Sequence, residues 1–144
     1  MTSRRWRHAG VSMLGLLLAA SCLAACPPAP EDGQLLRQDG VELAWRPVLK
    51  GKVSDPSRIP MAEHFGLEVQ VCAGTAATAT LLRVDATMPE HRHGMNYTPR
   101  ITPLGGGRWR VEGMMFHMSG RWQMEFELRD GSGTQRLRHD IQVH

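Results

Sequence analysis

The chain has 144 residues, with 17 Lys or Arg against 14 Asp or Glu and a formal net charge of +3 when histidine is neutral. Three of the basic residues, Arg4, Arg5 and Arg7, precede an apolar stretch, and the rest of the chain carries equal numbers of acidic and basic residues. This balance provides no basic surface for nucleic acid, so we expect no nucleic-acid partner. The length is that of one domain.

The N-terminal segment has the pattern of an export signal. The three arginines precede uncharged residues 11–25, a run too short for a comfortable membrane span. LAAC at residues 23–26 resembles a bacterial lipobox, which implies cleavage before Cys26 and acylation of its thiol. An ordinary secretory signal with an incidental cysteine is the alternative. We predict a signal peptide over residues 1–25 and a lipoprotein anchored in a lipid bilayer of the bacterial cell envelope, facing the periplasm.

A proline-rich segment follows the predicted lipidation site. Three of the four residues after Cys26 are prolines, which favour an extended tether, and we assign residues 26–40 to this part of the chain. With Cys22 removed and Cys26 acylated, Cys72 remains alone and no internal disulfide is expected. Cys72 is predicted to be a small buried hydrophobic residue. The domain over residues 41–144 therefore depends on its core.

Apolar and polar residues alternate with a period of two through most of this domain. Such a period is typical of strands with one buried face. It predicts strands at FGLEVQV, LLRVDATM, RWQMEFELRD and LRHDIQV, and shorter strands at VELAWRPV and RWRVEG. The expected inward faces are Phe65, Leu67, Val69 and Val71; Leu82, Val84, Ala86 and Met88; Trp122, Met124, Phe126 and Leu128; and Leu137, His139, Ile141 and Val143.

Glycines and prolines separate these segments. DGSG at residues 130–133 predicts a hairpin turn, and three consecutive glycines at residues 105–107 predict another turn. Prolines such as Pro103 indicate sheet edges and loops. With six to eight short strands and no amphipathic helix, the chain is predicted to be all-β: a small antiparallel β-sandwich with immunoglobulin-like architecture.

The segment MPEHRHGMNYTP, residues 88–99, concentrates side chains that bind metals. If this segment is extended, His91, His93 and Met95 project to one side because their spacing is two. Met88, at its start, is a further candidate ligand. The alternative interpretation is a solvated polar loop.

A second cluster, EGMMFHMSGRW at residues 112–122, contains the candidate ligands His117 and Met118. Loops at one end of a small sandwich lie close together, so the two clusters can share one site. Met114 and Met118 have the same parity as the expected core residue Trp122. Core packing is therefore the alternative interpretation for both methionines.

The combination of imidazole and thioether side chains favours copper. Thioether sulfur is soft and suits Cu(I), and imidazole binds both Cu(I) and Cu(II). Zinc more often combines histidine with cysteine or carboxylate, and calcium needs a carboxylate-rich loop that this sequence lacks. We predict a copper site whose candidate ligands are His91, His93, Met95, His117, Met88 and Met118.

The same two clusters carry a family resemblance. DATMPEHRHGMNYTP, followed by a glycine-rich turn and RVEGMMFHMSGRWQMEFEL, resembles the YtkA-like domain, which is related to FixH-type periplasmic proteins. The resemblance covers residues 65–130, although Ser119 stands where the family commonly has proline. It implies a small exported or membrane-anchored β-sandwich, associated in several relatives with copper handling or oxidase assembly. It also implies His91, His93 and Met95 as motif positions.

Two functions fit these observations. The first is a lipid-anchored domain that binds copper and passes it by ligand exchange to a copper-acceptor protein. The second is a structural or interaction module whose His/Met loops brace the sandwich or contact a partner, without specific metal binding. The sequence shows no complete catalytic constellation and no phosphate-binding loop, so we expect no enzymatic activity.

Overall fold

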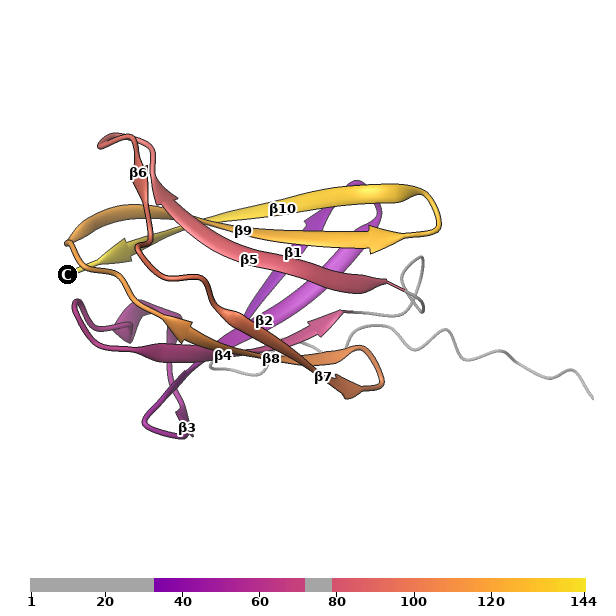
Figure 1. The fold of residues 1–144 in the computed structure, drawn as a ribbon, viewed down its shortest axis with the longest axis horizontal. Helices are drawn as coiled ribbons and strands as arrows, with labels where there is room; N and C mark the ends of the chain where they lie inside the picture. Colours follow the sequence, from indigo (N-terminus) through magenta and orange to yellow (C-terminus); the bar gives the residue numbers. More distant parts are fainter. Residues whose placement is uncertain (1–32, 72–78) are drawn as a thin grey trace, which may run out of the picture.

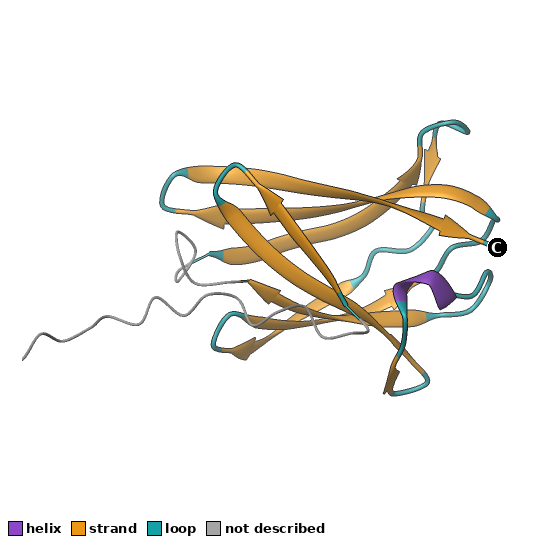
Figure 2. Cartoon of the chain, turned by 180° about the vertical axis from the view of Figure 1, so that it is seen from behind, coloured by secondary structure: helices purple, strands orange, loops and turns teal. Residues whose placement is uncertain are grey.

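The structure, a computed structural model, describes residues 33–71 and 79–144. Within these residues it contains ten strands and one short 3-10 helix (Figure 1; Figure 2). In chain order they are β1 (Gln34–Gln38), β2 (Val41–Leu49), β3 (Lys52–Val53), η1 (Pro56–Arg58), β4 (Phe65–Val71), β5 (Thr80–Met88), β6 (His93–Gly94), β7 (Arg100–Gly105), β8 (Arg108–Met114), β9 (Gly120–Asp130) and β10 (Gly133–Val143). The predicted signal peptide, Cys26 and Cys72 lie outside the described residues. The described part includes no helix with the length and hydropathy of a membrane span.

Two antiparallel sheets pack face to face, which confirms the predicted all-β sandwich (Figure 1). In the described part of the chain, the first sheet has six strands, in the order β1-β2-β4-β8-β7 with β3 also paired to β2. The second sheet has four strands, in the order β10-β9-β5-β6. Residues 115–119 therefore cross from the first sheet to the second, and residues 95–99 cross from the second to the first.

Side chains on the inner faces of the two sheets form one hydrophobic core. Every predicted inward residue of β4 and β9 is buried. The largest buried side chains, Trp45 and Trp122, come from opposite sheets. Trp45 lies against Phe126 with ring centres 6.0 Å apart, and Trp122 lies against Phe116 at 4.8 Å. Removal of this apolar surface from water is the main term that stabilises such a fold.

β5 departs from the predicted alternation near its start. A β-bulge between Leu81 and Arg83 shifts the register with β9, so that Leu81 faces the core and is 3% exposed. Leu82, which alternation placed on the inward face, is only half-buried. The alternation resumes at Val84, which is buried as predicted. A bulge adds one residue to one strand, so a prediction based on a strict period of two assigns the residues before the bulge to the wrong face.

Periodicity did not predict β1, β3, β6 or β7. β1 lies within residues 26–40, the predicted tether, yet it pairs with β2 along its whole length, so the folded domain begins before residue 41. β7 is the edge strand of the first sheet, a position in which a strand tolerates a proline such as Pro103. All the described strands are contained within residues 27–144.

His139 lies on the inner face of β10, as predicted, and is half-buried. Its imidazole meets the indole of Trp45 from the opposite sheet in a T-shaped contact, with ring centres 5.8 Å apart. Burial lowers the pKa of His139 below its ordinary value of 6.5, and the neighbouring Asp140 carboxylate opposes this effect only in part. The folded chain therefore binds a proton at His139 less readily than the unfolded chain does.

The bulge in β5 predicts that the adjacent residues Leu81 and Leu82 contribute unequally to the free energy of unfolding. Leu81→Ala should lower the free energy of unfolding by about 2–5 kcal/mol, the usual cost of truncating a well-packed leucine. Leu82→Ala should cost less than about 1 kcal/mol, because this side chain is half-exposed. Urea titration followed by tryptophan fluorescence measures both values. Equal losses, or a larger loss for Leu82→Ala, would contradict the bulge.

The position of His139 predicts that acid destabilises the fold. Below about pH 6.5 the unfolded chain gains a proton at His139 that the folded chain, with its lowered pKa, does not yet bind. The free energy of unfolding should therefore fall as the pH drops from about 6.5 to 5. His139→Phe should flatten this slope. Urea titrations at several pH values test it, and an equally steep slope in the variant would assign the effect to other groups.

Candidate metal site

The β5–β6 hairpin carries the first His/Met cluster. Met88 ends β5 and pairs with His93 in β6, and turn residues 89–92 join the two strands. The backbone N–H groups of His91 and Arg92 donate to the carbonyl oxygen of Met88 at 3.1 and 2.9 Å, and Arg92 has a left-handed φ of 57°. The expectation of one extended segment is therefore wrong for His91, which lies in the turn. A chain reversal breaks the alternation on which that expectation depends.

The second His/Met cluster lies where the chain crosses between the sheets. β8 ends at Met114, and residues 115–119 connect it to β9. Within this connection Phe116 is buried, and its carbonyl oxygen accepts a 2.7 Å hydrogen bond from the N–H of Ala62. These contacts hold the middle of the connection against the core and against the loop before β4. His117, the next residue, is thereby held at the end of the sandwich.

The methionines of the two clusters differ in burial. Met114 is fully buried, as the core interpretation predicts, whereas Met118 is 37% exposed and does not follow that interpretation. Met88 is fully buried, and a Cβ added to Gly120 would lie 2.9 Å from its Cε atom, so Met88 fills the core beside the start of β9. Met95 is partly buried and packs against the core. Met118 is thus the most exposed of the candidate thioethers.

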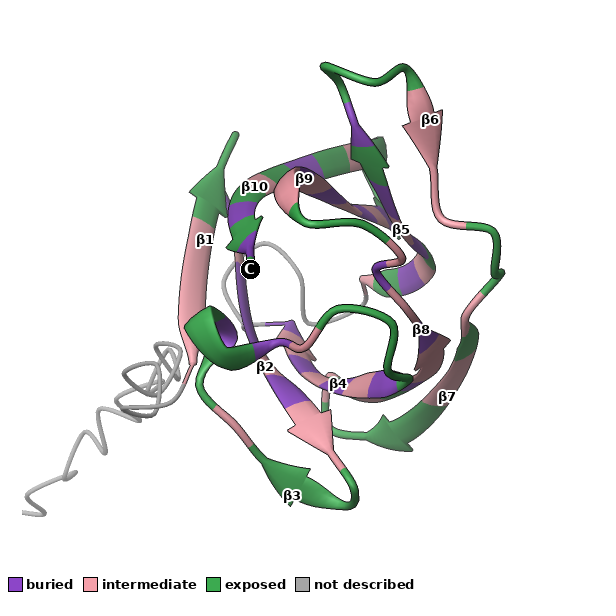
Figure 3. Ribbon diagram, turned by 90° about the vertical axis from the view of Figure 1, so that its left-hand side faces the viewer, coloured by how far each residue is buried: buried purple, intermediate pink, exposed green. Residues whose placement is uncertain are grey.

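Folding brings the imidazoles of the two clusters together. His93 and His117 have ring centres 5.1 Å apart and ring planes inclined by 33°. His91 lies 5.9 Å from His93 by the same measure. Both His93 and His117 stand nearly perpendicular to the indole of Trp122, at 6.0 and 5.4 Å. Figure 3 looks onto this end of the sandwich, where β6 and the connection from β8 to β9 lie.

Trp122 links this group of imidazoles to the core. Its buried indole donates a 3.0 Å hydrogen bond from Nε1 to the carbonyl oxygen of Met118, which ties the connection carrying His117 to β9. The sequence assigned Trp122 only to the core. The alternation of apolar and polar residues indicates which face of the strand a side chain lies on. It does not indicate which other segments of the chain contact that side chain.

One ring nitrogen of each central imidazole is buried without a partner. Neither His93 Nδ1 nor His117 Nδ1 has a hydrogen-bond partner among the described residues. Most buried polar atoms in proteins are satisfied, and leaving one unsatisfied costs about 1–3 kcal/mol. A metal ion takes the place of a hydrogen-bond donor at an imidazole nitrogen, since neutral imidazole is a common metal ligand. These two nitrogens are therefore suited to ligate a metal.

The spacing of the rings is compatible with a shared ion. With metal–nitrogen bonds of about 2.0–2.1 Å and each nitrogen about 1.1 Å from its ring centre, one ion joins imidazoles whose centres are up to roughly 6.3 Å apart. The distances from His93 to His117 and to His91 are both within this limit. In residues 33–71 and 79–144, no group of three or more His, Cys, Asp or Glu side chains is arranged to hold a metal.

Salt bridges hold the hairpin turn against the second sheet. Arg121 of β9 donates to Glu90 in the turn at 3.1 Å and to Asp140 of β10 at 2.8 Å. The bond to Asp140, and next the bond to Glu90, raises the pKa of the Arg121 guanidinium. Gln123 and Arg121 in turn hold the pKa of Asp140 below its ordinary value. This network joins three segments and fixes the turn that precedes His93.

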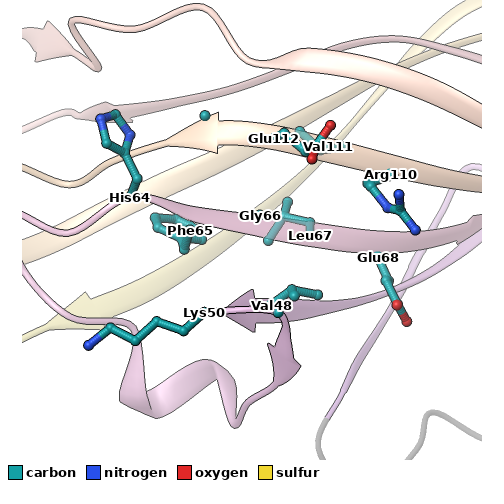
Figure 4. A pocket seen from close by; sticks show the side chains of 12 residues that line it. Val48, Lys50, His64, Phe65, Gly66, Leu67, Glu68, Arg110, Val111 and Glu112 are labelled. Carbon is teal, nitrogen blue, oxygen red and sulfur yellow. The ribbon is translucent and has the colours of Figure 1, made fainter.

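A separate hollow of about 440 Å³ lies on the outer face of the first sheet, around Gly66 (Figure 4). Gly66 has no side chain to fill this space, and a Cβ there would lie only 2.7 Å from the carbonyl oxygen of Val111. His64 stands at one end of the hollow and Arg110 at the other (Figure 4). The lining side chains spread outward instead of converging, so we assign the hollow no ligand.

The Arg121 network predicts a local change in dynamics. Arg121→Gln should loosen the hairpin turn, because Glu90 loses its cationic partner. The N–H groups of His91 and Arg92, which bond to Met88, should then exchange with solvent about threefold faster or more. Amide hydrogen exchange measures this rate. Arg138→Gln, which breaks only a pair with Glu125 across β9 and β10, is the matched control, and equal rates in the two variants would contradict the role of Arg121.

Comparison of the chain with protein-family models, with curated proteins and with solved structures gives no match. The resemblance to the YtkA-like domain therefore stays a prediction made from sequence motifs. The features that indicate a functional site are the 5.1 Å approach of the His93 and His117 rings and their unpartnered Nδ1 atoms.

Proposed function

We propose that this chain binds copper, as Cu(I), through His93 and His117 and passes it to a partner protein. The observation that carries the proposal is the approach of two imidazoles from separate segments to 5.1 Å, each with a buried and unpartnered Nδ1. In a solvated polar loop, by contrast, the imidazole nitrogens bond to water and need no second imidazole beside them.

The types of donor support copper over zinc. Among the described residues no three His, Cys, Asp or Glu side chains converge on one point, and zinc sites are usually built from three or four such ligands. Cu(I) accepts soft thioether sulfur beside imidazole. Met95 and Met118 lie two residues after His93 and directly after His117, so each cluster has one thioether close to its imidazole along the chain.

Ligand exchange is the transfer step that this arrangement favours. The ion is cargo, held by few protein ligands at the end of the sandwich. Met118 is exposed, whereas the two imidazoles are half-buried and Trp122 packs against both. A soft ligand from an acceptor protein displaces the chain's own ligands one at a time, beginning with the most exposed.

The sequence also indicates where in the cell the proposed copper protein is located. The predicted signal peptide and the acylation of Cys26 make the chain a copper carrier of the bacterial cell envelope, anchored in a lipid bilayer and facing the periplasm. The YtkA-like resemblance supports the same assignment, in copper handling or oxidase assembly.

A structural or interaction module is the alternative function. The contacts of His93 and His117 with Trp122 favour it, because aromatic packing of this kind stabilises a fold without any ligand. The imidazoles then brace the end of the sandwich, and copper binds only weakly. The two functions differ in metal affinity, which is directly measurable.

An anaerobic titration tests the copper proposal. Residues 27–144, which contain every described strand, are titrated with Cu(I) against a chromophoric chelator. We expect one ion per chain with a Kd below about 1 μM, which corresponds to roughly −8 kcal/mol. His93→Ala and His117→Ala should each weaken binding by about tenfold or more, because each removes one of the two imidazoles.

His64→Ala is the matched control, because the His64 imidazole contacts Tyr97 and not the His93–His117 pair. Met95→Leu and Met118→Leu, tested singly, identify the thioether that contributes to binding. Weak binding by the parent chain, or binding unchanged in both the His93 and His117 variants, would contradict the copper proposal and favour the structural module.

A further inference from the structure

We infer that His91 is a loading ligand, through which copper enters and leaves the His93–His117 pair. This inference rests on the proposed copper function. It concerns the route that the ion follows, whereas the proposed function concerns the place where the ion resides.

The three imidazoles form a series that leads from the exposed His91 to the half-buried pair of His93 and His117. His91 is exposed in the hairpin turn, whereas His93 in β6 and His117 are both half-buried and each has a buried Nδ1. Successive ring centres are 5.9 and 5.1 Å apart. His93 is therefore the common member of two imidazole pairs, and both pairs are within the roughly 6.3 Å that one ion spans.

The backbone of His91 is held, whereas its side chain is not. The backbone N–H bonds to the carbonyl oxygen of Met88, and the preceding residue, Glu90, is paired with Arg121. The imidazole itself makes no hydrogen bond with the described residues, and its ring contacts that of His93. An exposed imidazole on a hydrogen-bonded turn is suited to take an ion from solvent or from a partner and to present it to His93.

The inward step is a simple exchange of ligands. The bond from copper to His117 forms, the bond to His91 breaks, and the bond to His93 is retained throughout. Copper stays Cu(I), neutral imidazole nitrogens donate the electron pairs, and no proton is transferred. The outward step reverses this order. Because His93 holds the ion during both steps, a fully released ion is not an intermediate.

This role has a specific kinetic consequence. A group that only lowers the barrier between the free and bound states changes the forward and reverse rates by the same factor. The equilibrium Kd then stays the same when that group is removed. A resident ligand behaves differently, because its removal raises Kd.

Stopped-flow measurements on residues 27–144 test the inference. One experiment follows Cu(I) loading from a weak chromophoric chelator complex, and the other follows its removal by an excess of a strong chelator. In His91→Gln both rates should fall by about tenfold, while Kd from the equilibrium titration stays within about threefold of the parent value. His64→Gln makes the same chemical change at another exposed histidine and should alter neither rate.

The outcomes are distinguishable. A Kd that rises in His91→Gln as much as in His93→Ala would make His91 a resident ligand and overturn the inference. Loading and removal rates equal to those of the parent chain would show that His91 takes no part in copper exchange, and this result would also overturn the inference. A parent chain that fails to bind Cu(I) in the equilibrium titration would instead overturn the proposed function. A urea titration that matches the parent excludes unfolding as the cause of slower exchange in His91→Gln.

Discussion

The packing of Trp122 between the sheets is the interaction on which both the fold and the candidate site depend. Its indole fills the core beside Phe116, donates a hydrogen bond to Met118 and contacts the imidazoles of His93 and His117. One buried side chain thus contacts both the core and the two histidines. A site built in this way gains its rigidity from the core and needs no dedicated scaffold of its own.

The histidines also depend on where the chain leaves its strands. The connection of residues 115–119 passes from one sheet to the other, and the change of direction separates residues that a continuous strand would keep on one face. Met114 remains in the core, whereas Met118 reaches the surface. His117 lies between them along the chain, at the seam of the two layers, where β6 of the second sheet also ends. The pair of imidazoles therefore belongs to neither sheet alone.

Much of the fold is predictable from the sequence, because burying one face of a strand imposes a period of two. That rule identified the inward faces of β4 and β9. It failed at Leu82, where a bulge adds a residue, and at His91, where a turn reverses the chain. Sandwich geometry indicates that the two His/Met clusters can meet at one end, but nothing in the sequence singles out the contact between His93 and His117. It depends on a hairpin and a sheet crossing whose relative position only the folded chain defines.

The irregular edge strand β7 affects whether neighbouring copies of the chain can pair through their sheets. Pro103 supplies no N–H to a neighbouring strand, and the register shift between Pro103 and Gly105 makes the end of β7 irregular. An edge of this kind is a poor template for sheet extension. If the chain is tethered by lipid as proposed, copies concentrated on one membrane would resist polymerising through this edge.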